Sequence, residues 1–85
     1  MMEDKLDKTL QFDKNELKEE KVRSILKHVD KSLSEKDYDS LNQIVGYLIS
    51  NDPAYISSYN DARKRMLEVS RDEIIEELVK SYLKK

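Results

Sequence analysis

Helical periodicity is the feature that most restricts the fold of this chain. One stripe of apolar residues, spaced three and four positions apart, runs through residues 22–33: Val22, Ile25, Leu26, Val29 and Leu33. This spacing places all of them on one face of a helix. No segment alternates apolar and polar residues as a half-buried strand does. The sequence therefore predicts an all-α fold.

Capping residues divide the chain into a tail and a helical domain. Residues 1–12 are charged and lack periodicity, which predicts a flexible tail. Asp13 is a good helix N-cap, and Glu16 three residues later completes a variant of the capping box. We therefore expect one helical domain over residues 13–85, with a first helix that ends near Ser34.

A second helix and a short helical turn are expected next. Asp39 is predicted to cap a helix that ends at Ser50. Asp52 before Pro53 is typical of an N-cap followed by a first helical position, and it predicts one short turn of helix. Gly46 lies inside the second helix, where glycine costs about 1 kcal/mol relative to alanine. Either another backbone approaches this glycine closely, or the glycine is simply tolerated.

Two further helices are predicted in the C-terminal third. Asn60 is a candidate N-cap for the fourth helix. Three apolar residues would form the inner face of that helix: Ala62, Met66 and Val69. Ser70 and Glu73 have the spacing of a capping box for the last helix. The expected architecture is a compact bundle of four helices plus one short helical turn.

The last helix carries an apolar stripe that is too wide for one neighbour to cover. The stripe comprises Ile74, Ile75, Leu78, Val79, Tyr82 and Leu83. Either this helix lies in the middle of the bundle, or its stripe forms a dimer interface. A chain of 85 residues with 38% hydrophobic residues has a thin core, for which sharing a face with a second copy is a common remedy. We expect a homodimer with Ile75, Leu78 and Tyr82 in its interface.

The residues that catalysis needs are scarce. With one glycine, the chain cannot build a glycine-rich phosphate loop. His28 is the single histidine and cysteine is absent, so no metal site or activated nucleophile is expected, and His28 is expected on the surface. Adjacent carboxylates such as Glu76 and Glu77 diverge by about 100° on a helix and are expected to form a solvated acidic face. We predict that the protein is not an enzyme and holds no cofactor.

Charge and hydropathy restrict the partners. Sixteen basic and eighteen acidic residues give a net charge of −2, which argues against a nucleic-acid binder that relies on bulk charge. The run Arg63-Lys64-Arg65 with Arg71 keeps open one alternative, a helical module that contacts nucleic-acid phosphates. Arg71 also stands in the first turn of the last helix, where a cation opposes the helix dipole, and such a violation can mark a functional residue. No apolar run is long enough to span a membrane, so we expect no membrane insertion and a cytoplasmic location.

Thr9 is the single threonine of the chain, and it lies in the predicted tail. A protein kinase can bind a hydroxyl of a mobile segment in extended form, and a phosphate there would add nearly two negative charges. Thr9 is therefore a candidate phosphorylation site.

Five blocks of the sequence match, in order and spacing, those of a known family. They are NQIVGYL at 42–48, DPAYI at 52–56, DAR at 61–63, RDEIIEELV at 71–79 and YLK at 82–84. Through these blocks the chain, over about residues 9–84, resembles the IreB/ReoM family of small regulatory proteins of Gram-positive bacteria. Leu67 stands where a basic residue is common in that family, so the surface arginines of the family carry over at Arg63 and Arg71.

The resemblance implies a function as well as a fold. It implies an all-helical homodimer without known catalytic activity, phosphorylated on Thr9 by the membrane Ser/Thr kinase that bears PASTA repeats and reset by its partner phosphatase. It also implies control of peptidoglycan precursor synthesis and of cephalosporin tolerance. The route implied is ClpCP-dependent loss of MurA, the UDP-N-acetylglucosamine carboxyvinyltransferase, which phosphorylation relieves.

A charge switch is the mechanism that we expect from this resemblance. The unmodified protein would engage the ClpCP machinery or MurA through a surface near Arg63 and Arg71. Further partner-binding residues are expected in the neighbouring blocks: Asp52, Tyr55 and Arg65. Phosphate on Thr9 would either mask the arginines through charge-assisted pairs or repel an acidic partner. A purely structural dimer, the remaining reading, predicts no response to mutation of Thr9.

Overall fold

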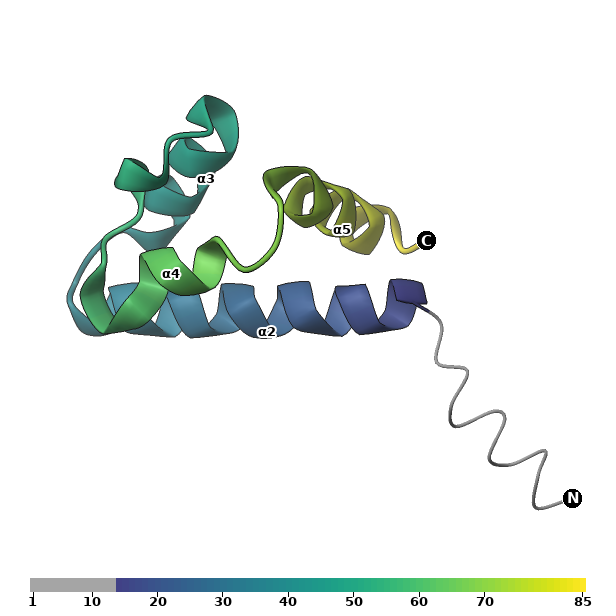
Figure 1. Ribbon diagram of the computed structural model, residues 1–85, viewed down its shortest axis with the longest axis horizontal. Coiled ribbons are helices and arrows are strands. Elements are labelled where there is room, and N and C mark those ends of the chain that lie inside the picture. The colour runs from purple at the N-terminus through teal and green to yellow at the C-terminus, as the bar shows by residue number, and fades with distance from the viewer. Residues whose placement is uncertain (1–13) are drawn as a thin grey trace, which may run out of the picture.

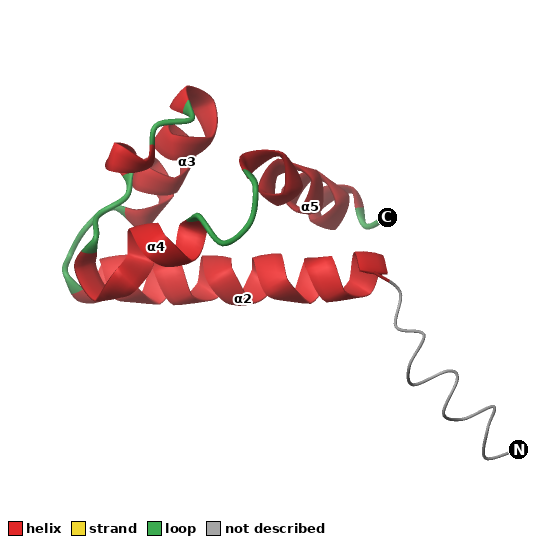
Figure 2. Cartoon of the chain, viewed as in Figure 1, coloured by secondary structure: helices red, strands yellow, loops and turns green. Residues whose placement is uncertain are grey.

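The computed structural model describes residues 14–85, and it forms helices joined by short loops, with no strand in that range (Figure 2). The elements are α2 (Lys14–Glu35), α3 (Ser40–Ser50), the 3-10 turns η1 (Pro53–Tyr55) and η2 (Tyr59–Asp61), α4 (Ala62–Met66) and α5 (Arg71–Leu83). The prediction of an all-α fold with four helices is confirmed. The second 3-10 turn, η2, was not predicted. The tail over residues 1–12 and the capping box of Asp13 with Glu16 fall outside the residues whose side chains are described.

Helix α2 is the element on which the others are assembled. It has 22 residues, and α3, α4, α5 and η2 all pack against it (Figure 1). The apolar stripe predicted in this helix supplies four fully buried residues: Val22, Ile25, Val29 and Leu33. Leu26 is half-buried beside them. The remaining core side chains come from α3, α4, α5 and two loop positions: Tyr47, Ile56, Ala62, Met66, Val69 and Ile74.

The caps of α3 and η1 form as their residues predict. The Asp39 carboxylate accepts a hydrogen bond from the Asn42 backbone N–H at 3.1 Å, so α3 begins at Ser40. At the other end Asn51 adopts a left-handed conformation, which turns the chain toward η1. The Asp52 carboxylate then accepts from the Ala54 N–H at 3.0 Å and starts η1 at Pro53.

The fourth helix differs from its prediction. Asn60 does not cap it, because both Asn60 and Asp61 have positive φ angles, 50° and 61°, and α4 begins only at Ala62. The helix ends at Met66 after five residues, so Val69 is buried from the following turn rather than from the helix. The Asn60 side chain instead donates to the Ser32 hydroxyl on α2 at 3.0 Å. A long-range contact therefore overrides the local capping preference of this asparagine.

Helix α5 begins with the predicted capping box. The Ser70 hydroxyl accepts from the Glu73 N–H at 3.2 Å, and the Glu73 carboxylate accepts from the Ser70 N–H at 3.1 Å. The hydrogen bond from the Ser70 backbone is the main cause that lowers the pKa of Glu73 from its ordinary value of 4.5, with Lys18 nearby at 3.5 Å. Only Ile74 and Glu77 of this helix are buried. The alternative that places α5 in the middle of the bundle is therefore wrong, since the helix lies at its edge.

Candidate functional site

The predicted phosphorylation site, Thr9, lies outside the described residues. It precedes the first residue of α2 by five positions. Figure 1 shows that the N-terminal end of α2 lies on the same side of the molecule as the C-terminal end of α5. The first residue of α2, which follows Thr9 by five positions, therefore lies at the same end of the described fold as the end of α5.

Arg63, in α4, is held by the segment that precedes its own helix. Its Nε donates to the Ile56 carbonyl at 2.8 Å, and its backbone N–H donates to the Ser57 carbonyl at 3.1 Å. Ile56 is fully buried, so its carbonyl would otherwise lack a partner from water. The guanidinium is thus fixed at the junction between η1 and α4, where it is half-buried.

Arg71 occupies the first position of α5, and the structure gives a reason for a cation there. Its Nη1 donates to the Leu48 carbonyl at 3.3 Å. Leu48 lies in the last turn of α3, where carbonyls have no partner within the helix and the dipole is negative. Arg71 therefore opposes the dipole of its own helix but complements that of its neighbour. The cation in the first turn of α5, which was unexpected from the sequence, therefore has a structural explanation.

The remaining basic residues of α4 are divided between an ion pair and solvent. Arg65 Nη1 lies 3.0 Å from the Glu68 carboxylate, and Lys64 is exposed. The four cations of the nucleic-acid alternative thus do not form one uncommitted patch. Arg63 and Arg71 donate to backbone carbonyls of two different segments, and a third cation has an acidic neighbour.

Asp52 and Tyr55 build the turn that covers the outer face of α3. Asp52 supplies the cap of η1, and the Tyr55 ring lies against Gly46. A Cβ built on Gly46 would stand only 2.5 Å from Tyr55 Cδ1. The close approach expected at this glycine is therefore present, but an aromatic side chain makes it rather than a backbone. Both Asp52 and Tyr55 remain exposed in the single chain and are available to a partner.

The residues predicted for a dimer interface face solvent in the single chain. Ile75 and Leu78 are about two-fifths exposed, and Tyr82 is 88% exposed. Helix α3 presents a second row of exposed apolar side chains: Leu41, Val45 and Ile49. The exposed apolar side chains of α5 and of α3 thus leave two stretches of apolar surface on the single chain. This is the kind of surface that protein partners cover.

His28 was expected on the surface, and it lies there half-buried, in contact with a segment that is distant in the sequence. Its ring Nε2 lies 3.1 Å from the Asn60 carbonyl, within reach to donate a hydrogen bond, and Ser32 lies one turn further along α2. Ser32 is fully buried and accepts from the Asn60 side chain. These three residues form a polar contact that joins α2 to η2. The helical wheel places His28 off the apolar stripe, but it cannot show that a distant loop returns to that face.

Glu77 was expected in a solvated acidic face, and that prediction is wrong. The residue is only 5% exposed, whereas its neighbour Glu76 is exposed as expected. One carboxylate oxygen, Oε2, lies 3.4 Å from Lys80 Nζ. The other, Oε1, is buried and has no hydrogen-bond partner among the described residues. Its burial results from the packing of α5 on α2, which a sequence pattern does not encode for a glutamate.

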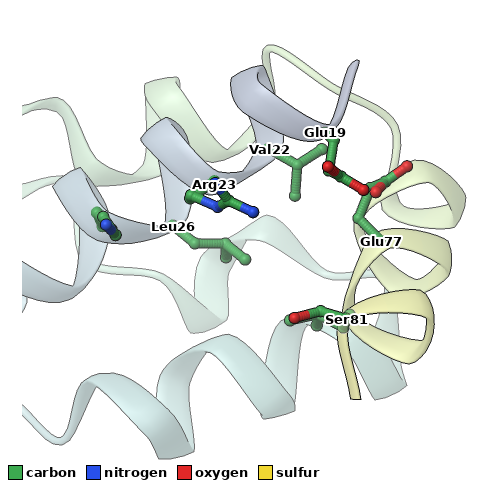
Figure 3. A pocket seen from close by; sticks show the side chains of 8 residues that line it. Glu19, Val22, Arg23, Leu26, Glu77 and Ser81 are labelled. Carbon is green, nitrogen blue, oxygen red and sulfur yellow. The ribbon is translucent and has the colours of Figure 1, made fainter. Parts of the chain in front are cut away.

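A recess of about 150 Å³ opens beside Glu77, between α2 and α5. Figure 3 shows Val22 and Leu26 along α2, with Glu19 reaching from α2 and Glu77 from α5 toward one another. Leu78 and Ser81 complete the α5 side. The recess thus has an apolar wall, an acidic end and two cations, Arg23 and Lys27, among its lining residues. It continues along α2 into a shallower groove toward α3, which shares Leu26 and Leu78 with it.

Metal-binding clusters and membrane-spanning helices are both absent from the described part of the chain. Residues 14–85 hold no group of three or more histidine, cysteine, aspartate or glutamate side chains positioned for a metal ion. Within the same range, no helix combines the length and the apolar character that crossing a membrane requires.

A comparison with known protein families finds a match over nearly the whole chain. The family described as IreB regulatory phosphoprotein matches residues 7–84. The match extends beyond the described helices at the N-terminal end and takes in Thr9. It also includes every residue discussed above for the partner-binding surface and for the recess.

Proposed function

The chain belongs to the IreB family of regulatory phosphoproteins, and from that premise we propose that it is a non-catalytic cytoplasmic regulator of peptidoglycan precursor synthesis. In this proposal a PASTA-domain Ser/Thr kinase phosphorylates the protein and a cognate phosphatase resets it. The output is tolerance of cephalosporins. The observation that carries the proposal is the family match over residues 7–84, which includes the threonine outside the described fold.

We propose Thr9 as the phosphorylated residue because most serine hydroxyls of the described fold are engaged elsewhere. A kinase binds its acceptor in an extended segment, which a helix does not offer. The Ser32 hydroxyl is buried. Several other serine side chains already take part in hydrogen bonds: Ser34, Ser40, Ser50, Ser57 and Ser70. Thr9 precedes α2 in the sequence and is not one of these engaged hydroxyls.

We propose that the unmodified protein promotes ClpCP-dependent degradation of MurA and that phosphorylation relieves this action. The homodimer would present Arg63 and Arg71 to the protease machinery or to MurA. Each arginine uses one guanidinium nitrogen for a backbone carbonyl, which fixes its position without neutralising its charge. A fixed cation at the surface is suited to pair with a carboxylate or a phosphate. Phosphate on Thr9 would act by occupying these cations or by repelling an acidic partner.

The test compares three strains that express wild-type protein, Thr9→Ala or Ser24→Ala from the natural locus. Ser24 is an exposed hydroxyl within α2 and serves as the matched control. We expect Thr9→Ala to keep MurA low and the cells sensitive to cephalosporins, while Ser24→Ala behaves as wild type. Mass spectrometry should find phosphate on residues 9–14 in wild-type cells and none when the kinase is deleted. Normal MurA levels in the Thr9→Ala strain, in kinase-competent cells, would overturn the proposal.

A further inference from the structure

The Glu77 carboxylate is the polar group of the fold whose partners are incomplete. It is 5% exposed, and its Oε1 has no partner within residues 14–85. Leaving a buried carboxylate oxygen without a donor costs free energy, so native structures usually supply one. Lys80 reaches only the other oxygen. The hydrogen-bond donor for Oε1 is therefore expected to come from outside the described residues.

The surroundings of Glu77 indicate which kind of segment could supply that donor. Val22, Leu26 and Leu78 form the apolar wall of the recess, and Glu19 adds a second carboxylate at its acidic end (Figure 3). The recess, of about 150 Å³, is large enough for a group the size of benzene. The recess thus suits a segment that carries one cation and, beside it, one or two apolar side chains.

We propose that the N-terminal segment of this same chain lies in the recess, with the Lys8 ammonium paired to the Glu77 carboxylate. In an extended chain successive side chains point to opposite sides, so residues 8, 10 and 12 share one side. Those residues are Lys8, Leu10 and Phe12, one cation followed by two apolar side chains. The opposite side carries Thr9 and Gln11, which leaves the phosphate acceptor turned away from the recess.

The segment is long enough to reach. An extended chain spans at most 3.3–3.6 Å per residue, so Lys8 can lie up to about 17 Å from Asp13. Glu19, at the acidic end of the recess, is five residues into α2, or about 7.5 Å along its axis. The segment can therefore fold back over α2 with slack remaining. Because it is tethered, its effective concentration at the recess is in the millimolar range, and a weak contact is enough to occupy the site.

Two other cations lie near the recess and do not already fill this role. Arg23 and Lys27 are exposed and line its rim. Within residues 14–85 neither of them forms an ion pair with Glu77, whose one ionic neighbour in that range is Lys80.

Phosphorylation would release the segment. A phosphate on Thr9 stands next to Lys8 in sequence, so it competes with Glu77 for the same ammonium. It also brings nearly two negative charges close to Glu19 and Glu77. This release step rests on the proposed function, whereas the docking of the unmodified segment does not.

Paramagnetic relaxation enhancement tests the docking directly. The chain has no cysteine, so an Asp7→Cys variant accepts one nitroxide label on the side of the segment opposite Lys8. The ¹⁵N-labelled, spin-labelled chain is diluted into excess unlabelled wild-type protein, so that only contacts within one chain are seen. We expect the amide signals of Val22, Leu78 and Ser81 to be broadened, and those of η2 and α4 to be unaffected. Unbroadened signals along the recess overturn the proposal.

Two paired variants identify the contact. Lys8→Gln and Glu77→Gln should each reduce the docked fraction about tenfold, the loss expected for one charge-assisted hydrogen bond. The controls, Lys5→Gln in the same segment and Glu76→Gln on the exposed side of α5, should leave the broadening unchanged. If Glu77→Gln fails to fold, Lys8→Gln tests the pair alone. Equal broadening in Lys8→Gln and Lys5→Gln overturns the pairing.

A second, mixed sample tests whether the other subunit of a dimer supplies the segment. Here the ¹⁵N-labelled chain carries no spin label and is mixed with excess spin-labelled chain. Broadening of the recess signals in this sample alone means that a partner subunit supplies the segment, which overturns the proposal. If the segment docks but Thr9 is never phosphorylated in cells, the docking proposal stands and the proposed function fails. The two failures are therefore distinguishable.

Discussion

The Tyr55 ring lies directly over Gly46, so that a Cβ on the glycine would stand 2.5 Å from Tyr55 Cδ1 and 3.0 Å from Cε1. Two residues nine positions apart thereby bring η1 onto the outer face of α3. The glycine is right-handed helical and needs no positive φ. Its function is to leave space for the ring, which explains why a glycine stands inside this helix.

The contact between these two residues predicts a sign reversal in a double-mutant cycle. Gly46→Ala in the wild-type protein gains about 1 kcal/mol of helix propensity, but the new methyl collides with the Tyr55 ring and displaces η1. We expect a net loss of stability in urea denaturation. In a Tyr55→Ala background the collision is gone, and the same Gly46→Ala change should stabilise the protein by about 1 kcal/mol. Additive effects of the two substitutions would show that the ring moves aside freely.

The capping box of α5 predicts a dependence of stability on pH. The pKa of Glu73 is lowered from its ordinary 4.5, chiefly by the hydrogen bond from the Ser70 backbone. A carboxylate whose folded pKa is depressed stabilises the fold above its unfolded pKa, and that contribution is lost as the pH falls through the folded value. Glu73→Gln should therefore be less stable than wild type at neutral pH, and the difference should shrink below pH 4.5. Thermal unfolding at several pH values measures this, with Glu76→Gln as a control that shows no such convergence.

Arg71 is predicted to stabilise the fold independently of any partner. Arg71→Ala removes a hydrogen bond from a charged donor to the Leu48 carbonyl, which contributes about 1.5–3 kcal/mol. It also removes a cation from the positive end of α5, which returns about 0.3–1 kcal/mol. The net expectation is a loss of about 1 kcal/mol in urea denaturation. Arg65→Ala, which breaks an exposed pair with Glu68, should change stability by less than about 1 kcal/mol.

That comparison decides how a loss of regulation should be interpreted. If Arg71→Ala unfolds the protein at the temperature of the cellular assay, reduced activity reports stability and not partner binding. An Arg71→Ala variant as stable as wild type would contradict the structural role. Its guanidinium would then be assigned to a partner alone.

The buried contact between α2 and η2 predicts a difference between two serines two residues apart. Ser32→Ala leaves the Asn60 amide without its acceptor in a part-buried site and should cost about 1–3 kcal/mol. Ser34 is exposed and lies 3.5 Å from Asp30, so Ser34→Ala should be close to neutral. Equal stabilities of the two variants by thermal unfolding would argue that the Asn60 side chain finds another acceptor.

The exposed face of α5 predicts self-association that can be measured without any partner. Ile75→Asp and Tyr82→Asp place a charge on apolar surface that is exposed in the single chain. If a second copy covers this face, either variant should weaken the dimer strongly in sedimentation velocity, while circular dichroism of the monomer is unchanged. Leu67→Asp is the matched control, because Leu67 is an apolar residue outside α5 whose exposure lies between those of Ile75 and Tyr82. Dimers of unchanged stability in both α5 variants would place the interface elsewhere.

Local signals accounted for most of the elements and for few of the contacts between them. Caps with a side-chain oxygen at the right spacing predicted the starts of α3, η1 and α5, because these interactions involve residues within three positions. Asn60 has the same chemistry, yet its amide bonds to Ser32, 28 positions away. Its local preference gave no hint of that partner. The start of α4 was therefore predicted one residue too early.

The same distinction applies to the candidate site. Tyrosine and arginine positions could be read from the sequence, but their contacts with Gly46, Ile56 and Leu48 required the fold. Glu77 was misassigned because a glutamate between exposed neighbours has no apolar signature, and its burial arises only when α5 packs on α2. A sequence pattern reports which residues prefer the interior. It does not report which polar residues are carried there by their neighbours.

Helix α5 buries two side chains, Ile74 and Glu77, against the rest of the described fold, and its other contacts with that fold are partly exposed. The free energy needed to open a segment depends on what that segment buries, so the amides of α5 should exchange with solvent through local opening while those of α2 await global unfolding. One wall of the recess belongs to α5, and the recess exists only while that helix is docked. The apparent affinity of anything that binds there is therefore reduced by the fraction of molecules in which α5 is detached.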